Sequence, residues 1–111
     1  MKISVATFEF AVTGVTYDRT TVDGSGFTNC PKVTAHITTN GSGDITYHWT
    51  RSDGATAPTQ TLHFNSAGTK NVDETWQLGS ANTGTFWLGI YIDAPNHQAF
   101  GHKNVNPCTT P

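Results

Sequence analysis

Apolar and polar residues alternate with a period of two along most of the chain, and clusters of Gly, Asn, Asp and Pro interrupt this alternation at short intervals. Such a pattern is typical of half-buried β-strands joined by turns. No segment combines a helix cap with an amphipathic run. We predict strands at residues 3–17, 32–39, 45–51, 61–64, 71–78, 85–92 and 99–105. Seven or eight short strands at this spacing predict an all-β fold, an immunoglobulin-like antiparallel β-sandwich.

The N-terminal part of the chain has the least regular pattern. The first predicted strand changes phase between Val5 and Phe8 and contains Gly14, which predicts a bulge or a split into two half-strands. The segment 20–29 is rich in Gly, Ser and Thr, so we predict a loop there. We interpret Met1 as a start codon placed before a mature domain or a fragment. We expect a single domain over residues 1–111, with a flexible tail at 109–111.

The inward phase of the predicted strands defines the core. We expect Trp49 to fill the centre of the sandwich. The predicted structural core consists of Tyr47, Trp49, Trp76, Phe86, Leu88 and Ile90. Glu74 shares the phase of Trp76, and a carboxylate that faces the core is costly unless it is paired. A bulge that rotates Glu74 outward is the simpler interpretation, although the inward orientation stays open.

Charge narrows the classes of partner. Charged residues make up only 13% of the chain, and the formal net charge is −2. The six Lys and Arg residues are scattered, whereas nucleic-acid binding needs clustered cations, so we expect no nucleic-acid partner. No apolar run approaches the roughly 20 residues that cross a bilayer, so we expect no membrane insertion of this segment.

Cys30 and Cys108 form the only possible intramolecular cysteine pair. The low charge and the position of both residues at strand edges favour a disulfide over two buried thiols. In an immunoglobulin-type Greek key, the second strand begins and the last strand ends at the same end of the sandwich, so the two residues can approach each other. In the chain-entropy treatment, closing so long a loop destabilises the unfolded state by roughly 4–5 kcal/mol.

Several runs are distinctive: Cys-Pro at 30–31, Ile-Thr-Thr-Asn-Gly-Ser-Gly at 37–43, Tyr-His-Trp-Thr-Arg-Ser-Asp-Gly-Ala at 47–55, Gln-Thr-Leu-His-Phe at 60–64 and Ala-Gly-Thr at 67–69, with Trp76 and Trp87. Together they resemble immunoglobulin-like domains of exported bacterial proteins and, more loosely, PKD-type domains. The resemblance covers about residues 30–95. It implies a fold and an extracellular or cell-surface location. It implies no activity, and it offers no functional residue to transfer.

One face of the predicted sandwich carries candidate binding residues. Trp87 and Tyr91 are out of phase with the core residues of their strand, so they point to its outer face. His48 also points outward from the predicted neighbouring strand. Aromatic faces of this kind stack on sugar rings or anchor protein contacts, so we predict a ligand platform at Trp87, Tyr91 and His48. The alternative is that the N-terminal strand or a loop covers Trp87.

Candidate catalytic chemistry is sparse. The five histidines lack the spacing of known metal sites, and the aspartates lie mostly in turns, where their backbone preferences explain them. No nucleophile elbow, P-loop or dinucleotide fingerprint occurs. We therefore predict no catalytic residue, no metal and no cofactor.

These observations favour a non-catalytic extracellular module that binds a partner or spaces a larger protein. We expect a monomeric domain within that protein, with a protein or a glycan as ligand. A carbohydrate-binding accessory domain of a secreted hydrolase is the first alternative. An engineered immunoglobulin-like binding scaffold is the second.

Overall fold

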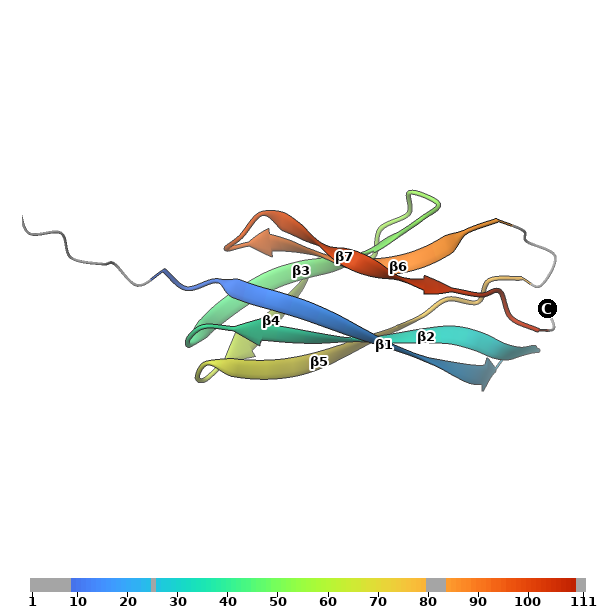
Figure 1. The fold of residues 1–111 in the computed structure, drawn as a ribbon, viewed down its shortest axis with the longest axis horizontal. Helices are drawn as coiled ribbons and strands as arrows, with labels where there is room; N and C mark the ends of the chain where they lie inside the picture. The colour runs from blue at the N-terminus through green and yellow to red at the C-terminus, as the bar shows by residue number, and fades with distance from the viewer. Residues whose placement is uncertain (1–8, 25, 80–83, 110–111) are drawn as a thin grey trace, which may run out of the picture.

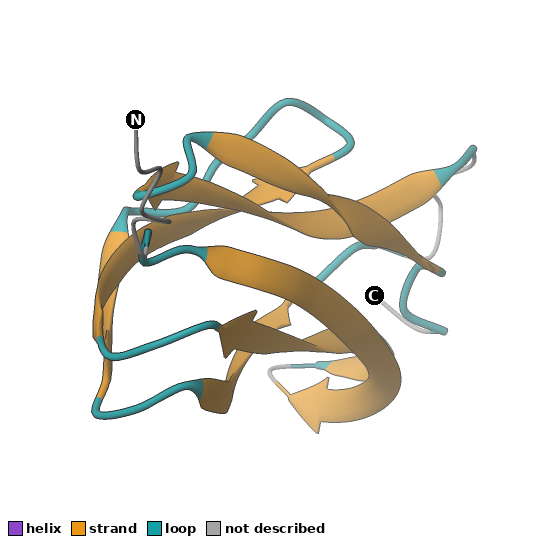
Figure 2. Ribbon diagram, turned by 60° about the vertical axis from the view of Figure 1, so that its left-hand side comes forward, coloured by secondary structure: helices purple, strands orange, loops and turns teal. Residues whose placement is uncertain are grey.

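The computed structural model describes residues 9–24, 26–79 and 84–109. The described residues form seven strands: β1 (Val12–Gly24), β2 (Phe27–Thr39), β3 (Gly43–Arg51), β4 (Gln60–Phe64), β5 (Gly68–Thr75), β6 (Phe86–Ala94) and β7 (Gln98–Val105). They make two antiparallel sheets, ordered β1-β2-β5 and β4-β3-β6-β7, which pack face to face (Figures 1 and 2). The predicted all-β sandwich is confirmed.

Alternation along the central strands builds the core. In β2 the side chains of Val33, Ala35 and Ile37 are fully buried, while the residues between them are half-buried on the outer face. Burying one such aliphatic side chain contributes roughly 1.5–3 kcal/mol. Of the predicted core residues, five are buried: Tyr47, Trp49, Trp76, Leu88 and Ile90. Phe86 is half-buried and meets the Trp76 ring edge-on at 5.8 Å.

The first strand differs from the prediction. Strand β1 begins at Val12 and continues to Gly24, whereas residues 3–8 of the predicted strand lie outside the described part of the chain. The predicted irregularity near Gly14 is present as a register shift between Val12 and Gly14.

The predicted loop at 20–29 is wrong. Thr20, Thr21 and Val22 are β-branched and pair with β2, so most of this Thr-rich segment is strand. The turn is confined to the few residues between β1 and β2, where Gly26 has a φ of +83° that glycine adopts without strain. The Gly, Ser and Thr content of this segment indicated a loop, because composition does not show that the segment pairs with β2.

The predicted outward rotation of Glu74 is also wrong. The β2–β5 register is continuous from Lys32 to Thr39, and Glu74 lies opposite buried Val33 on the inner face. Since β5 is an edge strand, Glu74 stays half-buried at the rim of the sandwich. Burial of the Tyr47 side chain raises its pKa most, and the nearby charge of Glu74 raises that pKa further. The edge position lets a carboxylate keep the inward phase without entering the core.

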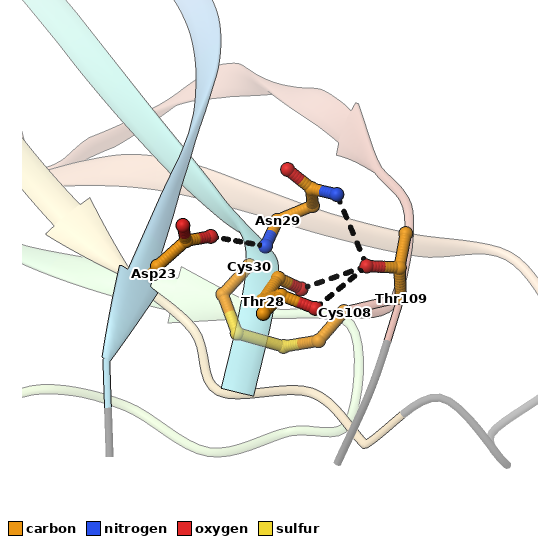
Figure 3. Close-up of a disulfide and its surroundings, with 6 residues drawn as sticks. All are labelled: Asp23, Thr28, Asn29, Cys30, Cys108 and Thr109. Carbon is orange, nitrogen blue, oxygen red and sulfur yellow. Dashed lines mark hydrogen bonds between the residues drawn. A yellow bond between two sulfur atoms is a disulfide. The ribbon is translucent and has the colours of Figure 1, made fainter. Parts of the chain in front are cut away.

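A disulfide joins Cys30 of β2 to Cys108, three residues after the end of β7 (Figure 3). The predicted bridge is confirmed, and both residues are buried. Backbone bonds hold the Cys108 segment in place, because the Cys108 amide donates to the Leu78 carbonyl and the Thr109 amide donates to the Thr28 carbonyl. The bridge therefore fastens the C-terminal segment to the β1–β2–β5 sheet at one end of the sandwich.

Strands β1 and β7 are the edges of different sheets, and side chains connect them. The Tyr17 hydroxyl donates to the Phe100 carbonyl at 2.6 Å and accepts a hydrogen bond from the Ile90 amide at 3.1 Å. The β6–β7 register shifts between Gly89 and Tyr91, so the Ile90 amide donates to this hydroxyl rather than to a strand partner. Burial raises the pKa of Tyr17. We call the boundary between β1 and β7 the β1–β7 seam.

Candidate binding face

The outer face of the β4-β3-β6-β7 sheet carries an aromatic strip, which we call the aromatic face. Its ring-bearing residues are His48, Trp87, Tyr91, His97 and His102. The β3–β6 register places His48 opposite Tyr91, and their rings stack with centroids 5.2 Å apart. The His48 Nδ1 atom lies 2.8 Å from an Asp93 carboxylate oxygen. His97 completes this group with its ring edge-on to Tyr91 at 5.8 Å.

Trp87 and His102 form a second ring pair. Their centroids are 4.6 Å apart and the planes differ by 22°. In the β6–β7 register, His102 lies opposite Gly89, so it is a diagonal neighbour of Trp87. Gly89 separates the two ring groups along β6. A Cβ atom at this position would overlap the Gly101 carbonyl oxygen, so the close approach of β7 requires glycine.

The structure places all three predicted platform residues on this one face. Trp87, Tyr91 and His48 are each half-buried. They are not a flat, continuous surface. His48 is hydrogen-bonded to Asp93 and stacked on Tyr91, whereas Trp87 stacks on His102. Strand β1, proposed as an alternative cover for Trp87, belongs to the opposite sheet.

Sequence reasoning missed the contributions of His97, His102 and Asp93 to the aromatic face. Alternation along residues 99–105 was detectable, but the register shift opposite Gly89 and Tyr91 changes which residues of β7 face outward. His97 has a positive φ of 55° in the turn after Pro95, a placement that alternation does not predict.

A hollow of about 320 Å³ adjoins the aromatic face at the β1–β7 seam. It is lined by Arg19, His102, Lys103 and Asn104. Because His102 also stacks on Trp87, the hollow and the second ring pair are continuous. The Arg19 guanidinium donates to the Asn104 carbonyl at 3.2 Å, which fixes one wall of the hollow across the seam.

The outer face of the β1-β2-β5 sheet, which we call the polar face, is built differently. At its centre, His36 Nε2 lies 2.6 Å from an Asp18 carboxylate oxygen, and His36 Nδ1 lies 2.6 Å from the Asn71 amide oxygen. Hydrogen bonding to Asp18, and then to Asn71, raises the pKa of His36. Thr34 donates to Asp73 at 2.7 Å on the same face.

The geometry offers little catalytic chemistry within the described residues. No group of three or more His, Cys, Asp or Glu side chains is placed to hold a metal ion in the described part of the chain. His36 and His48 lie on different sheets and on opposite outer faces. Glu74 lines a groove with Trp49 and Arg51, while the neighbouring carboxylate, Asp73, is bonded to Thr34 on the polar face.

Comparisons with known proteins leave the site to be interpreted from its own geometry. No protein-family model, no curated protein and no solved structure matches the chain. Within the described ranges, the chain forms no helix of the length and apolar character needed to cross a membrane.

Proposed function

We propose that this domain is a non-catalytic module of an exported or cell-surface protein, and that it binds a protein or glycan ligand through the aromatic face. The observation that carries the proposal is the concentration of rings on one outer face, where Trp87, Tyr91 and His48 keep part of their surface in solvent. Large rings offer contact area with few rotatable bonds, so binding them costs little conformational entropy.

The ring contacts favour binding over a passive spacer role. Asp93 fixes His48, His48 stacks on Tyr91, and the diagonal contact with His102 orients Trp87. Side chains that are held before a ligand arrives lose less freedom on association. A spacer needs only a solvated surface, and the polar face meets that need with no stacked ring pair among its described residues.

The disulfide supports an exported location. Bonds such as Cys30–Cys108 persist in oxidising compartments and are rare in the reducing cytosol. The weakly charged surface agrees with this assignment.

A glycan ligand is favoured by the spacing of the two ring groups. Trp87 and Tyr91 lie four residues apart on the same face of β6, which corresponds to roughly 13 Å along a strand. An extended ligand with repeated ring faces can contact both groups. This arrangement keeps the carbohydrate-binding accessory role as the second candidate.

Tryptophan fluorescence tests the proposal, with a panel of neutral and acidic oligosaccharides and bacterial cell-wall fragments as probes. Trp49 and Trp76 are buried, so Trp87 is the tryptophan whose emission a surface ligand changes most directly. We expect a saturable emission shift that is lost in Trp87→Ala. His36→Gln, on the polar face, is the control that should retain the shift. If no probe in the panel changed the tryptophan emission, the domain would be assigned a spacer role.

A further inference from the structure

The described cations of this chain fall into two groups. Lys32 pairs with Asp73, and Arg51 pairs with Asp53. Lys70 donates to the His63 carbonyl. Lys70, like Arg19 and Lys103, has no carboxylate at salt-bridge distance among the described residues.

Two of these three cations, Arg19 and Lys103, lie together at one place. Arg19 of β1 and Lys103 of β7 both line the hollow at the β1–β7 seam, together with His102 and Asn104. Each belongs to the inward phase of an edge strand, Arg19 opposite buried Val33 and Lys103 opposite buried Leu88. Long cationic side chains in such positions lay their stems along the rim and place their charge in solvent.

No Asp or Glu side chain of the described ranges lines this hollow. The nearest carboxylate along β1, Asp18, is bonded to His36 on the polar face. In a chain with a net charge of −2, two positive charges in one hollow, neither paired with a carboxylate of the described residues, are a local exception to the overall balance. Opposite charge and hydrogen-bond donors together favour a bound anion.

The hollow also borders a ring platform. His102 lines it and stacks on Trp87 at 4.6 Å, and Asn104 lies opposite Trp87 in the β6–β7 register. A ligand whose acidic group occupies the hollow can therefore place an adjoining ring against the Trp87–His102 pair. Sugar rings meet aromatic faces in this way.

From this arrangement we infer that the seam hollow binds the carboxylate of an acidic saccharide, with Arg19 and Lys103 holding the carboxylate and the Trp87–His102 pair contacting the sugar ring. This inference rests on the proposed function and specifies the ligand class of the aromatic face. Two cations suit one or two carboxylates. They do not suit the dense phosphates of a nucleic acid.

The test compares two probes with the same sugar backbone: tetragalacturonate, whose carboxylates are charged, and its fully methyl-esterified form, whose esters are neutral. Binding is followed by two-dimensional ¹H–¹⁵N NMR on the intact chain. We expect the acidic probe to bind at least tenfold more tightly, with shifts at Lys103, Asn104 and the Trp87 indole. Raising the salt concentration should weaken the acidic probe selectively, since exposed charges are screened.

Three variants sharpen the test. Lys103→Gln should lower affinity for tetragalacturonate about tenfold, the loss expected for one charge-assisted contact. Arg19→Lys, which keeps the charge but not the planar fork, should lower it less than Arg19→Gln. Lys32→Gln removes a cation already paired with Asp73 on the other sheet and should leave affinity unchanged.

The outcomes separate the inference from the proposed function. Equal binding of both probes, with shifts at Trp87, would overturn the inference and leave the aromatic face as a neutral-glycan site. Unchanged acidic binding in Lys103→Gln and Arg19→Gln would also overturn it. If those variants only aggregate more, the cations protect the strand edges, and the inference fails. Absence of binding to either probe contradicts the inference, while the wider fluorescence panel still decides the proposed function.

Discussion

The polar face and the aromatic face each have a histidine on a central strand, but the two histidines are held differently. His36 lies between the oxygens of Asp18 and Asn71, both from neighbouring strands, so its ring ties three strands together. His48 has one carboxylate partner and a stacked Tyr91 ring, and the strip around it ends at a hollow without anions. Cross-strand polar bonds thus satisfy the polar face internally, whereas the aromatic face leaves part of its ring surface in solvent.

The Cys30–Cys108 disulfide links β2 of one sheet to the segment that follows β7 of the other, and its removal has the largest expected effect. Replacing Cys30 and Cys108 together by Ser should lower the free energy of unfolding by about 4 kcal/mol, because the unfolded chain regains the freedom of a long loop. Urea unfolding monitored by circular dichroism measures the change. A loss below about 1 kcal/mol would mean that the bonds of Cys108 and Thr109 to Leu78 and Thr28 already fix this end.

Tyr17→Phe tests the seam between the two sheets. Removing the hydroxyl leaves the Ile90 amide and the Phe100 carbonyl without this partner, and we expect a loss of about 1–3 kcal/mol. Thr16→Val is the matched control, since its side chain is on the exposed side of the same strand. Equal stability of Tyr17→Phe and the wild type would show that water replaces the hydroxyl.

A paired substitution compares the two faces directly. Trp87→Ala removes the stack with His102 and should cost about 0.5–1.5 kcal/mol in addition to the apolar burial that it loses, whereas Thr34→Ala on the polar face should cost about 0.2–1 kcal/mol. Thermal unfolding of both variants gives the comparison. A loss of about 3–5 kcal/mol for Trp87→Ala, the cost of truncating a fully buried Trp, would assign Trp87 to the core instead of to a binding surface.

The smallest effect is the pH dependence of the polar face. Because the folded pKa of His36 is raised above its unfolded value, the stability that it contributes is fully present below about pH 6.5 and is lost as pH rises through the folded pKa. The difference in Tm between the wild type and His36→Gln should therefore shrink from pH 5.5 to pH 8. A difference that grows with pH contradicts the proposed bonding of the imidazolium.

Sequence periodicity correctly predicted which side chains point inward where a strand has one buried and one exposed side. It predicted the inward residues of β3 and β6 and the outward placement of His48, Trp87 and Tyr91. It failed at residues 20–29, where strand formation depends on pairing with β2, and at Glu74, whose inward phase is tolerated only because β5 is an edge. The stack of His102 on Trp87 and the bond from Tyr17 to Phe100 depend on a register shift and on sheet packing, which no local pattern encodes.

The assignment of binding to the aromatic face is tested most directly by two matched double variants, Trp87→Ala/Tyr91→Ala and Thr34→Ala/Thr38→Ala, each one altering a single outer face. Retention of the folded proteins on immobilised acidic and neutral glycans is the measurement. We predict that the first variant loses retention and that the second binds like the wild type. Loss of retention in the second variant alone would place the binding surface on the opposite sheet and contradict the account.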